Sequence, residues 1–279
     1  MKVFFLISAT AAGMLLSGCF SHREAPERPV TASSLGEAVA CRETVQRVVL
    51  NGSKLASVPT ELASMPALAT LYLRDNAITD FAGLASLPAL GELDLSGVRM
   101  EKAPAELEAL RNLKRLYLTG CWLTEFPASA ATLPQLEYLN LDRNRLKSLP
   151  DALPAGLRWL RLNANGLESL PESIGALSGL RRIYLNDNAL KSLPESFGTL
   201  AEREDAALSN NKFEAFPEVL LALPKLRNLD LRGNPGVTAL PAEIGRMKAL
   251  RTLTLAGCRI PKEERDRIRK ALPECVVNF

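Results

Sequence analysis

Residues 180–200 read LRRIYLNDNALKSLPESFGTL, and this stretch decides the fold. Its skeleton, LxxLxLxxNxLxxLPxxFxxL, recurs with small changes from Val45 almost to the C-terminus. Successive copies begin at positions 45, 68, 90, 113, 136, 157, 180, 203, 226 and 250. The steps between copies are 21 to 24 residues, and chance clustering of apolar residues would not hold so narrow a period. The sequence therefore predicts ten structural repeats.

Each copy predicts a short strand followed by a return segment. In LxxLxL the fourth and sixth residues, such as Leu160 and Leu162, point to one side of a strand. One strand cannot bury that side alone, but stacked strands form a parallel sheet over a continuous core. The Leu-Pro pair that follows suits the start of a short helix, because proline fixes φ and lacks an N–H.

The ninth position of the repeat predicts a buried polar ladder. Asparagine there has the donors and acceptors that backbone groups at a bend need. The residues are Asn76, Asn144, Asn165, Asn188, Asn211 and Asn234. Ser53, Cys121 and Cys258 replace asparagine in three copies, whereas Val98 has no polar group. We expect the ladder to be weaker at Val98.

The period and the LPxxI/L/FxxL phrase resemble the leucine-rich repeat family over residues 45–260. The resemblance implies an α/β solenoid, a right-handed horseshoe of about ten repeats. Its concave face would be a parallel sheet, and its convex face would carry short α or 3-10 helices. The resemblance does not identify a ligand.

The N-terminus predicts a lipid anchor. Lys2 precedes an apolar stretch, Val3 to Leu16, that is too short to span a bilayer and leads into Leu16-Ser17-Gly18-Cys19. This pattern resembles the cleavage box of bacterial lipoproteins, which implies a signal peptide at 1–18 and a lipid on Cys19. The alternative is an ordinary secretory signal with a chance cysteine. Phe20, where aspartate would retain the protein in the inner membrane, favours the outer membrane.

The remaining segments follow from composition and pattern. Residues 19–34 predict a flexible tether, 35–44 an N-terminal cap, and 261–279 a C-terminal cap with a charged helix and a final strand. In the eighth repeat Arg203 stands where an inward leucine belongs, and Ala206 is small. We interpret this as a degenerate repeat with Arg203 facing solvent; the alternative is a hinge or pocket.

No catalytic, metal or cofactor site is predicted. The single histidine, His22, lies in the tether, and the chain contains no CxxC pair or Gly-rich phosphate loop. A net charge of +3 is too small to indicate nucleic-acid binding. Among the cysteines after Cys19, only Cys258 and Cys275 are expected to lie close enough for a disulfide bond. We favour the alternative that both are buried free thiols.

The concave face carries the candidate binding residues. All four tyrosines fall at concave positions of the repeat, and tryptophan and arginine accompany them. Tyr, Trp and Arg dominate interface energetics. The predicted partner-binding set is Tyr72, Arg115, Tyr117, Tyr138, Trp159, Arg161, Arg182 and Tyr184. The alternative is that these residues merely cover a wide β surface.

These observations predict a monomeric, non-enzymatic lipoprotein of the bacterial cell envelope that binds a protein or peptide. Repeats four to seven carry seven basic and three acidic concave residues, which favours an acidic partner. One alternative is a glycan or peptidoglycan binder that uses the same aromatic residues as stacking platforms. The other is a structural spacer without a ligand.

Overall fold

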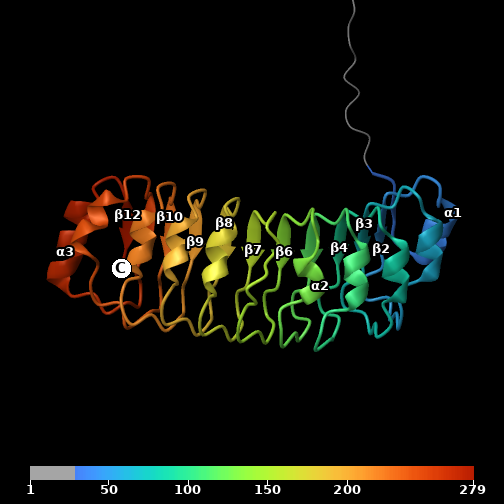
Figure 1. Ribbon diagram of the computed structural model, residues 1–279, viewed down its shortest axis with the longest axis horizontal. Coiled ribbons are helices and arrows are strands. Elements are labelled where there is room, and N and C mark those ends of the chain that lie inside the picture. Colours follow the sequence, from blue (N-terminus) through green and yellow to red (C-terminus); the bar gives the residue numbers. More distant parts are fainter. Residues whose placement is uncertain (1–28) are drawn as a thin grey trace, which may run out of the picture.

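The computed structural model describes residues 29–279, which form one parallel sheet of 12 strands in sequence order (Figure 1). The ten repeat strands are β2 Arg47–Val49, β3 Thr70–Tyr72, β4 Glu92–Asp94, β5 Arg115–Tyr117, β6 Tyr138–Asn140, β7 Trp159–Arg161, β8 Arg182–Tyr184, β9 Asp205–Ala207, β10 Asn228–Asp230 and β11 Thr252–Thr254. Two further strands, β1 Thr31–Ala32 and β12 Val276–Asn278, extend the sheet at its ends. The solenoid predicted from the period is confirmed.

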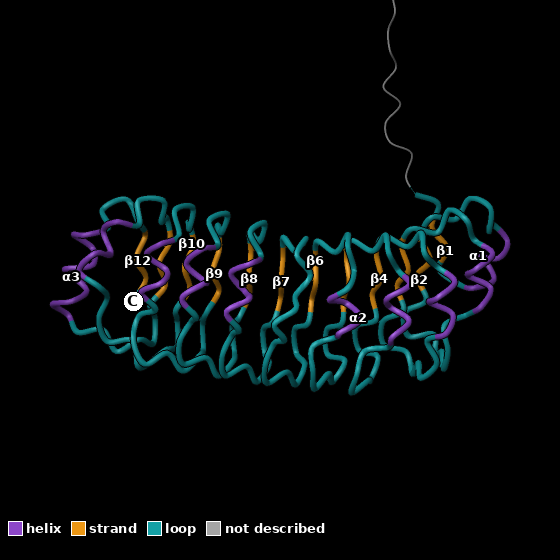
Figure 2. Tube along the Cα trace, in the orientation of Figure 1, coloured by secondary structure: helices purple, strands orange, loops and turns teal. Residues whose placement is uncertain are grey.

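Short helices return the chain between strands and cover one face of the sheet (Figure 2). They are the 3-10 helices η1 Thr60–Ser64, η2 Ala82–Ser86, η3 Ala105–Ala109, η4 Glu172–Ala176, η5 Glu195–Thr199, η6 Glu218–Ala222 and η7 Ala242–Arg246, together with α2 Ala128–Ala131. Proline precedes each of them except η2, which follows Phe81. The short fifth repeat turns back between β6 and β7 without a helix.

The two ends of the stack are closed by α1 Leu35–Ala40 and α3 Lys262–Ala271. The Ser34 hydroxyl accepts a hydrogen bond from the Glu37 N–H at 3.2 Å, which caps α1. The tether predicted up to residue 34 gives way to sheet earlier, because Thr31 already pairs with Arg47. The predicted signal peptide and Cys19 lie outside the described residues. No helix of the described part is long and apolar enough to cross a membrane.

The ninth-position asparagines form the ladder that the pattern predicts. The Asn188 amide donates to the carbonyls of Leu162 and Leu185 at 2.9 and 3.1 Å, and its oxygen accepts from the Leu167 N–H at 3.1 Å. Cys258 donates its Sγ–H to the Leu231 carbonyl at 3.2 Å instead, and Cys121 Sγ lies 3.2 and 3.7 Å from the carbonyl oxygens of Leu95 and Thr119. Each asparagine therefore links the backbones of neighbouring repeats.

Val98 interrupts the ladder. It is fully buried and offers neither a donor nor an acceptor. In other repeats the oxygen of the ninth-position asparagine accepts a hydrogen bond from a backbone N–H of the preceding repeat. Asn76, for example, accepts from the Leu55 N–H, which lies two residues after the ninth position of the first repeat. Within residues 29–279 the corresponding N–H, that of Ile78, has no acceptor.

The prediction for Arg203 is wrong. The side chain is completely buried, and its guanidinium lies 4.8 Å from the centroid of the Phe197 ring. No described residue accepts a hydrogen bond from its three guanidinium nitrogens. Burial lowers the pKa of Arg203 to about 9. Arg203 holds the first position of its repeat, just before β9, and Leu180 and Leu226 at the same position of the neighbouring repeats are fully buried, so this position faces the core whatever side chain it holds.

Candidate interaction surface

The strand register brings the predicted concave residues into two rows. Arg115, Tyr138, Trp159 and Arg182 are direct neighbours across β5 to β8. Tyr117, Asn140, Arg161 and Tyr184 form the next row on the same strands. The first and third residues of each three-residue strand point to the same face, because side chains alternate along a strand. The two rows therefore lie on one face of the sheet.

A hollow of about 340 Å³ lies over these strands, and we call it the concave hollow. Its lining residues are Arg115, Glu137, Tyr138, Trp159, Arg161, Arg182 and Tyr184. Six of the eight predicted residues therefore meet in one place. Tyr117 supports the hollow from its edge, with its ring 4.9 Å from that of Tyr138. Tyr72 lies apart on β3, where its hydroxyl donates to Glu92.

The arginines of the concave hollow are already paired with acids on neighbouring repeats. Arg115 Nε lies 2.9 Å from a Glu92 carboxylate oxygen, and the hydrogen bond raises the pKa of Arg115. Arg161 pairs with Asp142 at 2.8 Å, and Arg182 pairs with Asp205 at 2.9 Å.

The charge count from the sequence therefore overestimated the attraction of this face for an acidic partner. Glu92 and Asp205 lie in the third and eighth repeats, just outside the four repeats counted. A carboxylate at ion-pair distance cancels most of the field of its arginine. The concave hollow is polar and aromatic, with its charges balanced.

Tyr117 and Tyr138 keep neutral hydroxyl groups at physiological pH. Burial and the negative charge of Glu92 raise the pKa of Tyr117 to about 12, and burial raises the pKa of Tyr138. Arg161 lies 4.8 Å from the centroid of the Tyr184 ring. Its guanidinium is thus held from two sides, by Asp142 and by an aromatic face. These contacts restrain the Arg161 side chain before any partner arrives.

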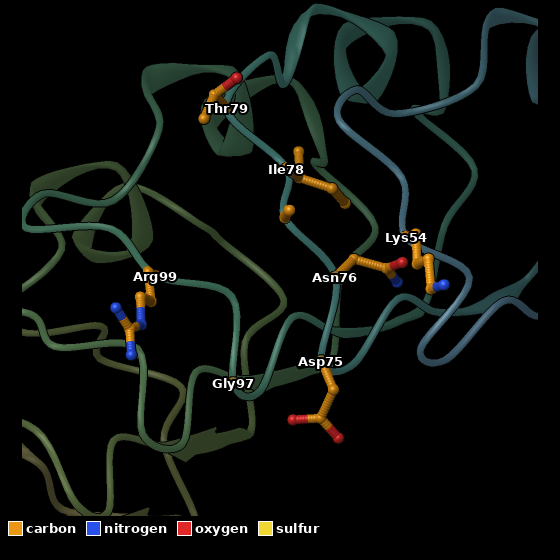
Figure 3. Close-up of a pocket in the computed structure, with 8 residues that line it drawn as sticks. Lys54, Asp75, Asn76, Ile78, Thr79, Gly97 and Arg99 are labelled. Carbon is orange, nitrogen blue, oxygen red and sulfur yellow. The ribbon is translucent and has the colours of Figure 1, made fainter.

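A smaller hollow of about 230 Å³ lies beside Tyr184, over β9 to β11. Its floor includes Ala206 and Ala207, where other repeats have larger side chains. The alternative of a pocket at the eighth repeat thus agrees with the shape of the sheet. The larger cavity of about 540 Å³ lies elsewhere, on the rim formed by the turns that follow the strands (Figure 3).

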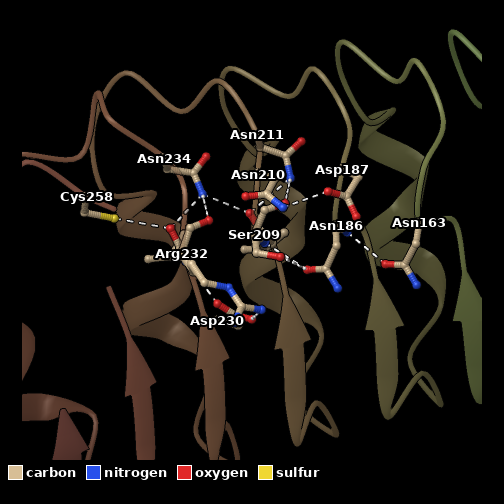
Figure 4. A network of polar contacts seen from close by, with 12 residues as sticks. Asn163, Asn186, Asp187, Ser209, Asn210, Asn211, Asp230, Arg232, Asn234 and Cys258 are labelled. Atoms are coloured by element: carbon tan, nitrogen blue, oxygen red, sulfur yellow. Dashed lines mark hydrogen bonds and ion pairs between the residues drawn. The ribbon is translucent and has the colours of Figure 1, made fainter. Parts of the chain in front are cut away.

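Sequence reasoning missed a second polar column at the seventh position of the repeat (Figure 4). The Asn163 side-chain oxygen accepts from the Asn186 N–H at 2.9 Å, and the Asn186 oxygen accepts from the Ser209 N–H at 2.8 Å. Asp142 continues the column by accepting from the Asn163 N–H at 2.7 Å. The recurrence of asparagine at the seventh position of two consecutive repeats could have signalled it.

The described residues contain no group of three or more His, Cys, Asp or Glu side chains placed to hold a metal. Cys41, Cys121, Cys258 and Cys275 are free thiols in the structure. Burial raises the pKa of the Cys121 thiol to about 12, which keeps it protonated and unreactive.

The comparisons with known proteins agree with this geometry at the level of the fold. Residues 111–155 match the family model described as Leucine Rich repeats (2 copies). No curated protein matches the chain. The matched segment covers β5 and β6 and the turns around them.

Solved structures with the same architecture come from several sources. An internalin from Listeria monocytogenes is 20% identical with a TM-score of 0.69, over 85% of this chain and 74% of that one. A chain of an octameric complex of Latrophilin 3, Unc5D and FLRT2 (LRR) is 20% identical with a TM-score of 0.62, over 81% of this chain and 78% of that one. A leucine-rich repeat protein of Leptospira interrogans is 21% identical with a TM-score of 0.50, over 89% and 99%. The structure is thus a leucine-rich repeat solenoid.

Proposed function

We propose that the chain is a non-enzymatic binding protein and that its concave hollow receives a protein or peptide partner. The observation that carries the proposal is the meeting of Tyr138, Trp159, Arg161 and Tyr184 in one hollow on a rigid sheet. Aromatic and arginine side chains that are held before binding lose little entropy when a partner arrives. The same fold occurs in a solved multiprotein complex that includes FLRT2.

The balanced charges bear on the kind of partner. Because Arg115, Arg161 and Arg182 have carboxylate partners, an acidic segment would compete with acids already present. A partner with mixed apolar and polar side chains fits the hollow better. Trp159 and Tyr138 would supply apolar contact, and the arginine–carboxylate pairs would supply both donors and acceptors.

We also propose that the protein is a lipid-anchored lipoprotein of the bacterial envelope, with the outer membrane favoured. The support is the sequence Leu16-Ser17-Gly18-Cys19 and the tether that follows it. Cys19→Ala should remove the anchor and leave the fold intact, because the tether separates the two. Mass spectrometry of the mature protein should find an acyl group on Cys19, and a soluble, unacylated wild-type protein would contradict the proposal.

A glycan ligand at the same surface is the second candidate. The observation that favours it is that Tyr138 and Trp159 pair on adjacent strands and both line the concave hollow. Sugar rings can stack on such a platform. A glycan should bind weakly and without dependence on salt, whereas a protein partner held partly through charged groups should be salt-sensitive. A spacer without a ligand should tolerate every concave substitution.

Trp159→Ala is the sharpest test of the concave hollow. Affinity capture from intact envelopes should identify a partner for the wild type. If Trp159 is a hot spot, the substitution should make the free energy of binding that partner less favourable by about 2–4 kcal/mol. Adding Arg161→Ala would confuse the result, because it leaves Asp142 without its ion-pair partner.

Two controls accompany this test. Trp122→Gly removes the other tryptophan, which lies on the rim, and Lys191→Ala with Glu195→Ala changes the opposite, helix-bearing face. Both controls should keep the partner. Capture by the Trp159→Ala protein at wild-type affinity, with an unchanged melting curve, would overturn the proposal.

A further inference from the structure

The rim that follows the strands carries exposed cations of a different kind from those on the concave face. Lys54, Arg99 and Arg145 occupy the tenth position of the first, third and fifth repeats, and all three are exposed. None of them forms an ion pair with any acid of residues 29–279. Their positive charges are available to a ligand.

Trp122 holds two of these cations in place. It occupies the tenth position of the fourth repeat, between Arg99 and Arg145 along the stack. Their guanidinium carbons lie 4.3 and 4.1 Å from its ring centroid. Two like charges without acid partners would otherwise separate into solvent, and the indole ring offsets their repulsion.

The backbone of Trp122 is also unusual. Its φ is 70°, in the left-handed region that bulky residues rarely adopt, and the side chain is 40% exposed. An exposed aromatic residue with a strained backbone contributes little to the fold. Lys54, at the same tenth position of the first repeat, also has a positive φ, of 59°.

The cavity of about 540 Å³ lies next to this cluster, between Lys54 and Arg99. It exists because the intervening tenth residue is the small Ala77 and because the step from the second repeat to the third is one residue shorter than most. Val98 supplies no side-chain acceptor at this level, so the Ile78 N–H at the cavity wall has no partner in the described part of the chain. The Thr79 residue lines the same wall.

One acid, Asp75, also lines this cavity. Figure 3 shows its carboxylate directed away from Ile78 and Thr79, with Lys54 and Arg99 on opposite sides. Asp75 rests against Gly97, whose φ of 77° and lack of a side chain allow the close approach. Two cations and one acid therefore line the cavity.

We propose that Lys54, Arg99, Trp122 and Arg145, together called the rim site, bind an acidic polysaccharide chain. The three cations recur at every second repeat, roughly 10 Å apart at about 4.8 Å per strand. A linear polyanion that lies along the stack can therefore meet all of them. The cavity between Lys54 and Arg99 has the volume of a small-ligand site and can take one sugar unit.

The shape of the rim favours a saccharide over other polyanions. An acidic peptide can pair with an arginine cluster, but the rim consists of turns and offers no strand edge to hold a peptide backbone. A flat anionic membrane would contact the exposed cations without filling the cavity. A sugar unit can enter it, where one of its hydroxyl groups would meet the Ile78 N–H. This site is independent of the concave hollow.

The test uses the full-length chain and an oligogalacturonate as the probe, with binding measured by calorimetry. The wild type should bind it, and binding should weaken as salt is raised. Arg99→Gln with Arg145→Gln should reduce affinity at least tenfold. The control, Arg111→Gln with Arg246→Gln, removes the same charge from exposed positions outside the rim site and should keep binding within twofold.

Trp122→Gly gives a second, finer measurement. Glycine accepts the left-handed backbone, so the fold should stay intact while the two guanidinium groups lose their support. We expect a severalfold loss of affinity with both charges still present. Trp159→Ala should bind the probe as the wild type does, which separates this site from the concave hollow.

Three results would overturn the proposal. The first is no binding of oligogalacturonate by the wild type, and the second is an equal loss in the Arg111/Arg246 control. The third is that poly-glutamate or phosphatidylglycerol vesicles bind as tightly as oligogalacturonate and lose affinity in the Arg99/Arg145 variant. A neutral dextran fragment should not bind at all.

Discussion

Arginine and aromatic residues meet on both the concave face and the rim, but their surroundings differ. On the concave face Arg161 has the carboxylate of Asp142 at 2.8 Å as well as the ring of Tyr184. On the rim Arg99 and Arg145 have the ring of Trp122 and no acid of the described chain. On the concave face the carboxylate balances the charge of the arginine. On the rim the positive charges stay available to a ligand. Residue type alone does not distinguish them.

The largest expected effect tests the concave half of this comparison. Asp142 is buried, pairs with Arg161 and accepts the Asn163 N–H. Asp142→Ala should therefore lower the free energy of unfolding by about 3 kcal/mol. On the rim, Arg145→Gln should change it by less than about 0.5 kcal/mol, because no acid depends on Arg145. Urea unfolding of both variants measures the difference, and equal effects would remove the distinction.

The asparagine ladder lies between the two surfaces, and we expect the second-largest loss of stability from a substitution in it. Asn188→Ala should destabilise the protein by about 2 kcal/mol, because three carbonyls and the Leu167 N–H lose a partner. Asn188→Cys should cost less, since Cys121 and Cys258 occupy the same position and donate to a carbonyl. Urea unfolding also measures this pair. Silent substitutions at Asn188 would show that the ladder adds nothing to stability.

Arg203 is a third arginine beside an aromatic ring, and unlike the other two kinds it is completely buried. It has an aromatic neighbour, as the rim arginines do, but neither solvent nor an acid. If solvent is what makes an unpaired arginine tolerable, Arg203→Leu should raise the free energy of unfolding by about 1–2 kcal/mol. Amide exchange over residues 203–209, which we expect to be faster than in β7 and β8 of the wild type, should slow in this variant.

The pH dependence of Arg203 gives an internal check on that variant. The pKa of Arg203 is lowered to about 9 in the folded state, so the unfolded chain binds its proton more tightly. Stability should rise as pH increases above 9, because the burial penalty falls when the native guanidinium loses its proton. The Arg203→Leu variant should lack this rise. A rise of the same size in both proteins would assign it to other groups.

Much of this molecule could be predicted from its period. The repeat placed Tyr138 and Trp159 on adjacent strands, because strand pairing follows the repeat length. The ion pairs were missed because each joins residues 19 to 23 positions apart, as Glu92 and Arg115 are. Comparing the same position in successive repeats would have found Glu92 beside Arg115, since both hold the third position.

Two residues escaped prediction for opposite reasons. Arg203 was assigned to solvent because charged side chains are rarely buried, yet its place at the buried first position of the repeat outweighs that preference. Trp122 lies just beyond the strand pattern, and its exposure depends on a left-handed backbone that its own residue type disfavours. Periodicity sets which way a strand residue points, but it does not fix the conformation of the turn that follows.

The weak packing of β9 has a mechanical consequence. In a solenoid each repeat contacts only its neighbours, so tension between the ends is carried in series through every repeat. The repeat with the lowest cohesion then sets the rupture force of the whole. Ala206 and the unpaired Arg203 make the eighth repeat that element. Under tension we expect the repeat that contains β9 to unfold first. Strands β5 to β8, which carry the concave hollow, should stay folded at that force.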